Sequence, residues 1–128
     1  PKPTGQPVPG TAQFRREVRP DPVLLFRYSA LIFYGHRIHY DADYTRDIEG
    51  YPGLIVHGPL TATLLIGFGL EQARDRVLRG IDIRAMSPLF APDAFWLEGE
   101  NKGDCIEMWA RGPGGTCAMR VTLRFAEP

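Results

Sequence analysis

The sequence predicts an α+β domain in which one long buried helix is covered by a curved antiparallel β-sheet. Three observations lead to this prediction. The chain has 128 residues, enough for one domain with a single hydrophobic core. From Leu60 to Leu70 the apolar side chains occur on almost every side, which is typical of a buried helix. The segments after this helix alternate in part between apolar and polar residues and are separated by turns, as in short paired strands.

The charge balance excludes several classes of partner. Fifteen Lys and Arg residues oppose fifteen Asp and Glu residues, so the formal net charge is zero. Proteins that bind nucleic acids or membrane surfaces need a basic excess, so we expect neither partner. No stretch reaches the roughly 18 apolar residues that cross a bilayer. We also expect a cytoplasmic protein, because no segment resembles a signal peptide and the two cysteines are expected to be reduced.

The chain begins with a proline-rich stretch, Pro1–Ala12, which also contains two glycines. This composition is typical of an extended arm or linker rather than of a packed element. A single domain is expected to span residues 13–128. Its first element is a short strand, Phe14–Val18, and the proline-containing turn after it separates this strand from the first helix.

A short helix is predicted over Val23–Phe33. Asp21 suits its N-cap and Pro22 its first turn, where the missing N–H of proline costs nothing. Gly35 is expected to end the helix, which places His36–His39 on the turn beyond it. The residues expected to face the core recur at helical spacing: Val23, Phe26, Ala30 and Phe33.

A second polar helix is expected over Asp41–Glu49, capped by Asp41 and stopped by Gly50. A turn at Gly50–Gly53 and a brief apolar run then lead to the sequence His57-Gly58-Pro59. The buried helix begins there, with Pro59 in its first turn, and becomes charged after Glu71.

The second half of the chain predicts four strands that pair as an antiparallel meander. The turn Gly112–Gly115 would place Cys105 near Thr122 and Cys117 near Ala110, so the two cysteines should not face each other. We therefore expect two reduced thiols. The four predicted strands are Val77–Met86, Phe95–Asn101, Cys105–Arg111 and Thr116–Phe125.

Two segments carry the candidate chemistry. Phe33–Asp41 contains two histidines, an arginine, two tyrosines and an aspartate within nine positions, so its side chains can move protons. Val56–Leu60 is a Gly-Pro entry into the buried helix, where free backbone N–H groups can hold a developing negative charge. We expect the two segments to form one site.

Four stretches resemble the MaoC-like hydratase/dehydratase family, closest to its mesaconyl-CoA hydratase and mitochondrial 3-hydroxyacyl-thioester dehydratase branch. The likeness covers about Val23 to Leu65. It implies the hotdog fold, a long helix wrapped by an antiparallel sheet. It also implies a hydro-lyase that reversibly adds water to a trans-2-enoyl thioester of coenzyme A or acyl carrier protein, without a cofactor. The stretches are Tyr28–Leu31, His36–Asp41, Gly50–Leu54 and Val56–Leu60.

The resemblance also implies roles for individual residues. His39 falls on the family's catalytic histidine, and Gly58 on the glycine whose N–H holds the thioester oxygen. Tyr34 stands where the well-studied hydratases carry an acidic residue, five positions before the histidine. Tyr34 either orients the water or donates a proton, or it packs over the acyl pocket. Asp41 is expected to cap the following helix, and it is the nearest carboxylate that could replace the missing acid.

The chemistry of hydration suits these residue types. Water must be activated at C3, a proton delivered at C2, and an enolate-like oxygen stabilised. Histidine can do the first two because its ordinary pKa, near 6.5, lies close to working pH. Gly58 admits close approach of a carbonyl, and Pro59 starts the helix whose N–H groups and dipole point at that oxygen.

Further residues are candidates for binding. Arg37 and Arg27 could meet the phosphates of coenzyme A, or lie in solvent as surface arginines commonly do. His57 could line the pocket or cap the helix, and His36 lies in the same loop as His39. A metal site built from these histidines would have a weak ligand spacing and no cysteine, so we expect no metal.

Two other functions remain open from the sequence. A non-catalytic hotdog subunit could bind acyl thioesters or support an active partner, and Tyr34 is the best argument for it. A thioesterase on the same fold is the other alternative; such enzymes usually place a carboxylate or asparagine near the helix start, and Thr61 or Thr63 there offers weaker chemistry. The hotdog sheet commonly pairs with another copy, so we expect a homodimer or pairing with a second hotdog domain.

Overall fold

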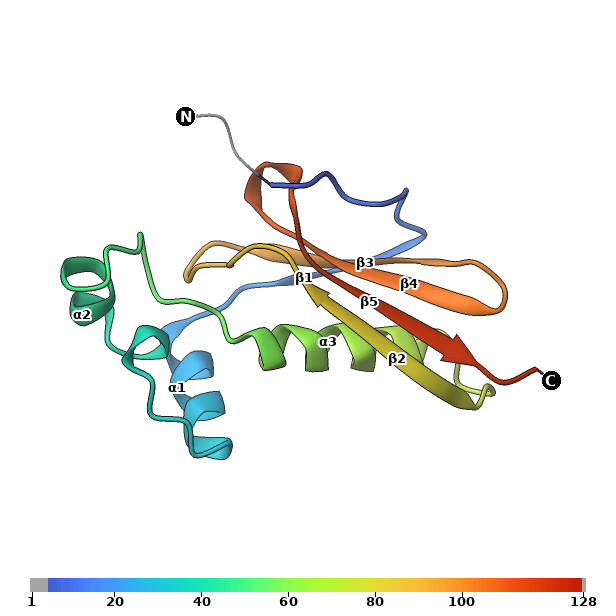
Figure 1. Cartoon of the computed structure of the whole chain (residues 1–128), viewed down its shortest axis with the longest axis horizontal. Coiled ribbons are helices and arrows are strands. Elements are labelled where there is room, and N and C mark those ends of the chain that lie inside the picture. Colours follow the sequence, from blue (N-terminus) through green and yellow to red (C-terminus); the bar gives the residue numbers. More distant parts are fainter. Residues whose placement is uncertain (1–4, 128) are drawn as a thin grey trace.

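A computed structural model describes residues 5–127. A five-stranded antiparallel sheet curves around one long helix, with two shorter helices beyond the start of that helix (Figure 1). The predicted α+β architecture is confirmed. In chain order the elements are β1 (Phe14–Val18), α1 (Pro22–Leu31), the 3-10 turn η1 (Arg37–His39), α2 (Ala42–Asp47), α3 (Gly58–Glu71), β2 (Leu78–Ala85), β3 (Phe95–Asn101), β4 (Cys105–Arg111), the 3-10 turn η2 (Pro113–Gly115) and β5 (Cys117–Phe125).

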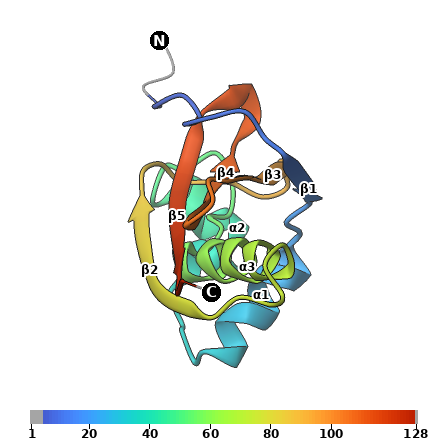
Figure 2. The same ribbon diagram turned by 90° about the vertical axis from the view of Figure 1, so that its right-hand side faces the viewer.

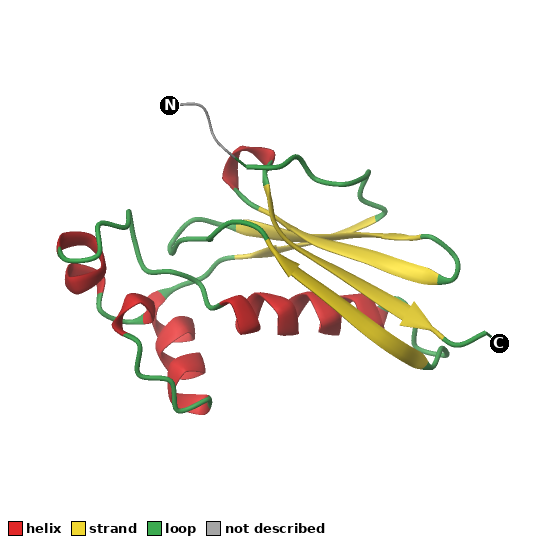
Figure 3. Ribbon diagram, viewed as in Figure 1, coloured by secondary structure: helices red, strands yellow, loops and turns green. Residues whose placement is uncertain are grey.

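The strand order in the sheet is β1-β3-β4-β5-β2. The predicted meander is confirmed for β3, β4 and β5, which pair in sequence. It is wrong for β2, which pairs with β5 and forms an edge of the sheet. Residues 86–94 connect β2 to β3 and are too many for a tight hairpin. They carry the chain across the end of the sheet, so β3 begins away from β2 (Figure 3).

The two cysteines lie at opposite ends of the β4–β5 hairpin. Cys105 pairs with Arg124 and Cys117 with Arg111, and both thiols are free within residues 5–127. The predicted partners were off by one or two residues because the connecting turn contains a 3-10 turn and the ladder contains a bulge beside Arg111. The expectation that the cysteines do not face each other is confirmed.

Helix α3 lies in the concave side of the sheet, and its side chains form the core together with those of β3, β4 and β5 (Figure 2). Leu65 is fully buried and Phe68 packs edge-on against Phe14 of β1. The expectation of burial on every side is wrong for one stripe, because the sheet covers only part of the helix. The exposed stripe consists of Pro59, Thr63 and Gly67.

Alanine substitutions at two glycines of α3 would test this packing. A Cβ on Gly69 would lie 2.5 Å from Leu123 Cδ1 and 3.1 Å from Met108 Cγ, whereas a Cβ on Gly67 would meet nothing within 4 Å. Gly69→Ala should therefore destabilise the domain by about 1–3 kcal/mol through overpacking. Gly67→Ala, the matched control, should be neutral or stabilise it by up to about 1 kcal/mol. Urea unfolding of both variants measures the difference, and equal stabilities would contradict this packing.

Helix α1 begins as predicted. The Asp21 side chain accepts a hydrogen bond from the Leu24 N–H (2.7 Å), and Pro22 occupies the first turn. The predicted inward face is wrong, because Leu25 and Ser29 are buried while Val23 and Phe26 are each 58% exposed. α1 ends at Leu31, before Phe33, whose backbone turns to φ 54° and whose side chain is 97% exposed.

The described part of the proline-rich stretch lies against the start of β5. The Cys117 N–H donates to the Gln6 carbonyl (2.8 Å), and Pro7 forms an isolated bridge with Thr116. Residues 1–4 of the predicted arm lie outside the described residues, and the division into arm and domain stays a prediction. None of the described helices is long and apolar enough to cross a membrane.

Candidate active site

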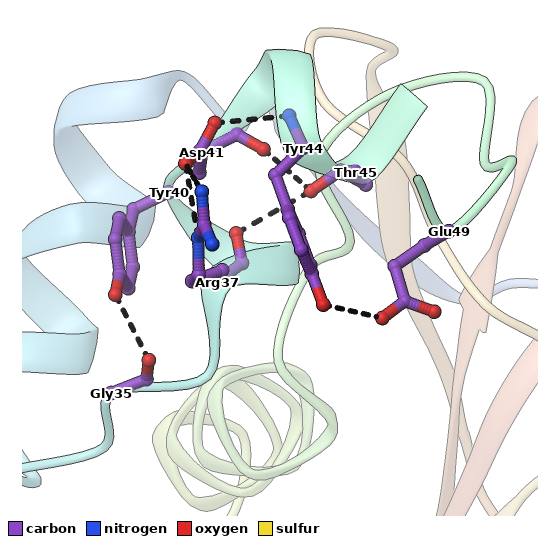
Figure 4. Close-up of polar contacts among 7 residues, drawn as sticks. All are labelled: Gly35, Arg37, Tyr40, Asp41, Tyr44, Thr45 and Glu49. Atoms are coloured by element: carbon purple, nitrogen blue, oxygen red, sulfur yellow. Dashed lines mark hydrogen bonds and ion pairs between the residues drawn. The ribbon is translucent and has the colours of Figure 1, made fainter. Parts of the chain in front are cut away.

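The loop between α1 and α2 is held in shape by its own polar contacts. Asp41 caps α2 as predicted, because its carboxylate accepts a hydrogen bond from the Tyr44 N–H (3.0 Å). The same carboxylate accepts from the Arg37 guanidinium (2.8 Å), which lies 4.0 Å from the centre of the Tyr44 ring (Figure 4). The Tyr44 N–H and Arg37 together hold the pKa of Asp41 below its ordinary value. These contacts fix the turn η1 that carries His39.

His39 is only 6% exposed, and its ring orientation defines its chemistry. Its Nδ1 lies 2.6 Å from the Ile55 carbonyl oxygen. A carbonyl can only accept, so Nδ1 carries the proton and Nε2 of the neutral ring keeps its lone pair. Burial lowers the pKa of His39 and nearby His36 lowers it further, while the Ile55 carbonyl partly opposes them. His39 is thus a neutral imidazole with one nitrogen ready to accept a proton.

His57 is 1% exposed and stands at the N-cap position of α3. Its Nε2 shares a hydrogen bond with Ser29 Oγ (2.7 Å), and the edge of the Tyr28 ring contacts it at 4.8 Å between centres. Its ring lies nearly parallel to that of His39, with centres 3.8 Å apart and planes 16° apart. Burial and the neighbouring His39 lower the pKa of His57 to about 4.

The two predicted segments meet at one cavity of about 290 Å³. Of the two readings of His57, lining the pocket is correct, because its side chain makes no capping hydrogen bond to the described residues. A second, mainly apolar cavity of about 300 Å³ begins at the same Gly58 and extends past Val56 and Thr61 toward Met119. The first cavity is lined by Ile32, Tyr34, His39, His57, Gly58 and Pro59.

Gly58 opens α3 and lies between the two cavities. An N–H in the first turn of a helix has no partner within the helix, and no acceptor is assigned to that of Gly58 among residues 5–127. The positive end of the helix dipole adds to its attraction for negative charge. A Cβ at this position would meet only Met119 Cε, at 4.0 Å, so a ligand oxygen has room to approach.

Not every candidate residue reaches the cavity. Asp41 and Arg37 are bound to each other, and His36 stacks on Tyr34 with ring centres 5.9 Å apart. None of these three candidates lines the cavity of His39, and neither does the exposed Arg27, so the expectation that they reach the substrate pocket is wrong for this cavity. Tyr34 does line it, with its ring centre 5.6 Å from that of His39.

Three contributors to the site were not predicted from the sequence. Ser29, which holds His57, could have been noticed because it follows Leu25 by four residues and therefore shares its buried face. Ile32 lines the cavity, and its position depends on the way the chain leaves α1. The Ile55 carbonyl, which orients His39, is a backbone atom and leaves no signal in the sequence. No group of three or more potential metal ligands is found in the described part of the chain.

The depressed pKa of His57 makes the stability of the fold depend on pH. The folded-state pKa is about 4 and the ordinary value is 6.5, so the unfolded chain binds the proton more tightly. Stability should be fully present above pH 6.5 and should fall by roughly 3 kcal/mol as the pH decreases to 4. Urea unfolding between pH 7 and pH 4 measures this loss. In His57→Phe, the control, the loss over this range should be much smaller.

Comparison with known proteins finds curated relatives of this chain. Mesaconyl-C(4)-CoA hydratase of Chloroflexus aurantiacus is 48% identical over 113 residues, which cover 86% of this chain and 39% of that protein. The mitochondrial hydroxyacyl-thioester dehydratase type 2 of Schizosaccharomyces pombe is 36% identical over 73 residues, covering 56% of this chain and 24% of that protein. The chain therefore spans less than half the length of these curated relatives.

Solved structures confirm the hotdog fold. An (R)-hydratase from A. caviae involved in PHA biosynthesis superposes with a TM-score of 0.73 at 19% identity, covering 93% of this chain and 97% of that one. The ChsH1–ChsH2 complex from Mycobacterium tuberculosis gives a TM-score of 0.74 at 16% identity, covering 94% and 98%.

The family assignment rests on the part of the sequence that builds the site. Residues 1–91, which include α1, the His39 loop and α3, match the family described as hydroxyacyl-thioester dehydratase type 2. This range extends well beyond the four stretches that carried the resemblance. The chain belongs to the hydroxyacyl-thioester dehydratase type 2 family.

Proposed function

We propose that this domain reversibly adds water to a trans-2-enoyl thioester to give a 3-hydroxyacyl thioester, which makes it a hydro-lyase. One observation carries the proposal. A neutral histidine with a free Nε2 and the N–H of a helix-opening glycine, His39 and Gly58, line the same cavity. The names of the two curated relatives, a hydratase and a dehydratase, support the same chemistry.

The geometry supports a mechanism with one proton carrier. The thioester carbonyl accepts a hydrogen bond from the Gly58 N–H. His39 Nε2 removes a proton from water as its oxygen bonds to C3, and the electrons move through C2 to the carbonyl oxygen. The Gly58 N–H and the helix dipole stabilise that oxygen. The protonated His39 then returns the proton to C2, so histidine and N–H finish as they began.

Tyr34 takes a supporting part in this proposal. Among the described residues, no carboxylate lines the cavity. The acidic residue that other hydratases place beside the histidine is therefore missing, and Tyr34 stands in its place. The Tyr34 ring lies on the cavity wall beside His39, and its hydroxyl can orient the water through a hydrogen bond. Asp41 acts indirectly, by capping α2 and holding the loop.

The proposal extends to the molecule that carries the acyl group and to the protein partner of the domain. The acyl group is carried by coenzyme A or by acyl carrier protein. The domain forms a homodimer or pairs with a second hotdog domain. This chain covers less than half of each curated relative, which leaves room for a second domain in those proteins. The edge strand β2 supports pairing, since its Ile81 and Ile83 side chains are 38% and 53% exposed. Both free cysteines fit a cytoplasmic location.

The deciding experiment is incubation of the protein with crotonyl-CoA and mesaconyl-CoA, following enoyl absorbance and free thiol together. Loss of absorbance without thiol release is the expected result. Thiol release alone would show a thioesterase, which the structure disfavours, because the Thr61 and Thr63 hydroxyls donate to the carbonyls of His57 and Pro59. No change with either substrate, together with measurable binding, would show a non-catalytic subunit.

A further inference from the structure

We propose that His57 is a positioning residue for His39, with its ring, anchored by Ser29, forming the flat surface that holds the catalytic imidazole in its working plane. The proposal rests on the proposed function for its kinetic consequences. Its structural part can be tested without any turnover.

A single hydrogen bond does not fix the orientation of an imidazole. The bond from Nδ1 of His39 to the Ile55 carbonyl restrains the ring, but a hydrogen bond tolerates a range of angles, so the ring can still tilt by small rotations about its side-chain torsions. The second restraint is the face of His57, which is 3.8 Å away and almost parallel. Together they determine where Nε2 points, which is the direction that hydration depends on.

Among the described residues, no other aromatic ring restrains His39 as closely as His57 does. Tyr34 lies 5.6 Å away between ring centres and is tilted by 42°, and its side chain is 47% exposed. The His36 ring is 6.0 Å away and tilted by 55°. Neither ring is close or parallel enough to fix the plane of His39. The orientation therefore depends on His57.

His57 is itself held firmly. It is almost fully buried, its Nε2 is bound to Ser29 Oγ, and Tyr28 packs against it in a T-shaped arrangement. Ser29 lies on the buried face of α1 and is 5% exposed. A chain of contacts thus leads from α1 through His57 to His39, so that the helix before the loop determines the orientation of the catalytic ring.

A purely structural role does not explain why a histidine occupies this position. Nδ1 of His57 is buried without a hydrogen-bond partner among the described residues. Such an atom costs on the order of 1–3 kcal/mol, which an apolar ring of similar size would avoid. Polar groups kept at this cost are concentrated at functional sites. The Ser29 anchor is what the histidine gains over such a ring.

The stacked rings of His39 and His57 do not both carry a positive charge. Two imidazolium rings this close would repel strongly, and the low pKa of His57, about 4, keeps it neutral while His39 exchanges protons. The other titratable groups facing the pair are His36 and Tyr34 from the loop and Tyr28 from α1. None of these is a carboxylate that would favour a second positive charge.

The test compares His57→Leu, which keeps the bulk but loses the flat face, with His57→Phe, which keeps a flat ring. We expect His57→Leu to lower kcat by about 10- to 100-fold while KM stays within about threefold. His57→Phe keeps the flat face and loses the bond to Ser29, so it should lower kcat by no more than about threefold to tenfold. Equal losses in the two variants, or full activity of His57→Leu, would overturn the proposal. Far-UV circular dichroism of both variants establishes that each is folded.

Ser29→Ala is a milder variant that leaves the His57 ring in place and removes its anchor. It should lower kcat by about threefold to tenfold without changing KM. This variant decides the question if His57→Leu does not fold, and wild-type kcat in Ser29→Ala would then overturn the proposal.

Nuclear magnetic resonance separates this proposal from the proposed function. The ring signals of His39 should be sharp in the wild type and in His57→Phe. In His57→Leu they should show relaxation dispersion from exchange between orientations. This outcome would support positioning even if no enoyl thioester were hydrated. A His39 ring that is equally rigid in all three proteins would overturn the proposal even if hydration were observed.

Discussion

Replacing His39 with glutamine should lower kcat for hydration of an enoyl thioester by about 10²- to 10⁴-fold, the usual contribution of a general acid–base group. Glutamine is suited to this test because its amide N–H can still donate to the Ile55 carbonyl, which His39 Nδ1 contacts at 2.6 Å. The substitution removes the nitrogen that accepts and returns the proton. The rate of loss of enoyl absorbance at saturating substrate measures the effect.

His36→Gln is the matched control, since it makes the same change three residues earlier in the same loop. The His36 ring stacks on Tyr34 and does not line the cavity, so its loss should cost less than about tenfold in kcat. Similar losses in the two variants would contradict the assignment of His39 as the proton carrier.

Gly58→Pro should lower kcat by about 10²- to 10³-fold, because it removes one oxyanion donor. The backbone is already suited to proline at this position. Gly58 is the first residue of α3, where proline is favoured, and His57 before it has φ −59° and ψ 134°, as residues before proline do. The lost N–H has no acceptor among the described residues, so the fold loses no hydrogen bond with it.

Gly58→Ala separates loss of the donor from added bulk. It keeps the N–H and adds a Cβ that would meet only Met119 Cε at 4.0 Å. We expect its main effect to be on KM, through the narrower cavity, while kcat is reduced far less than in the proline variant. Steady-state kinetics of both variants give the comparison. If alanine reduced kcat as much as proline, the Gly58 N–H would not be the donor.

The pairing of His39 with Gly58 was predictable because both lie in short motifs whose residue types are tied to their chemistry. The turn carrying His39 was also predictable, since the capping role of Asp41 depends on local contacts alone. The burial of Ser29 follows from its spacing to Leu25, but its role in the site was not predictable, because that role depends on a contact with His57, 28 residues away in the sequence. Local patterns determine the elements, and tertiary contacts determine which of their residues reach the site.

The two errors about helices have a common cause. Helical spacing in α1 and the apolar composition of α3 show which residues share a face, but not what that face packs against. Val23 and Phe26 share a face that the rest of the described chain leaves exposed. In α3, the exposed Thr63 and Gly67 lie on the side that the sheet does not cover. The position of β2 depends likewise on strand order, which alternation within a strand does not encode.

The site depends on the backbone of Ile55 rather than on its side chain. The Ile55 N–H donates to the Ile38 carbonyl (2.9 Å), and its own carbonyl accepts from His39. On either side, the Val56 N–H donates to the Leu89 carbonyl and the Ala91 N–H to the Leu54 carbonyl. Backbone groups are the same whatever side chain they carry. Evolution can therefore exchange the half-buried side chain at position 55 while the catalytic histidine keeps its orientation.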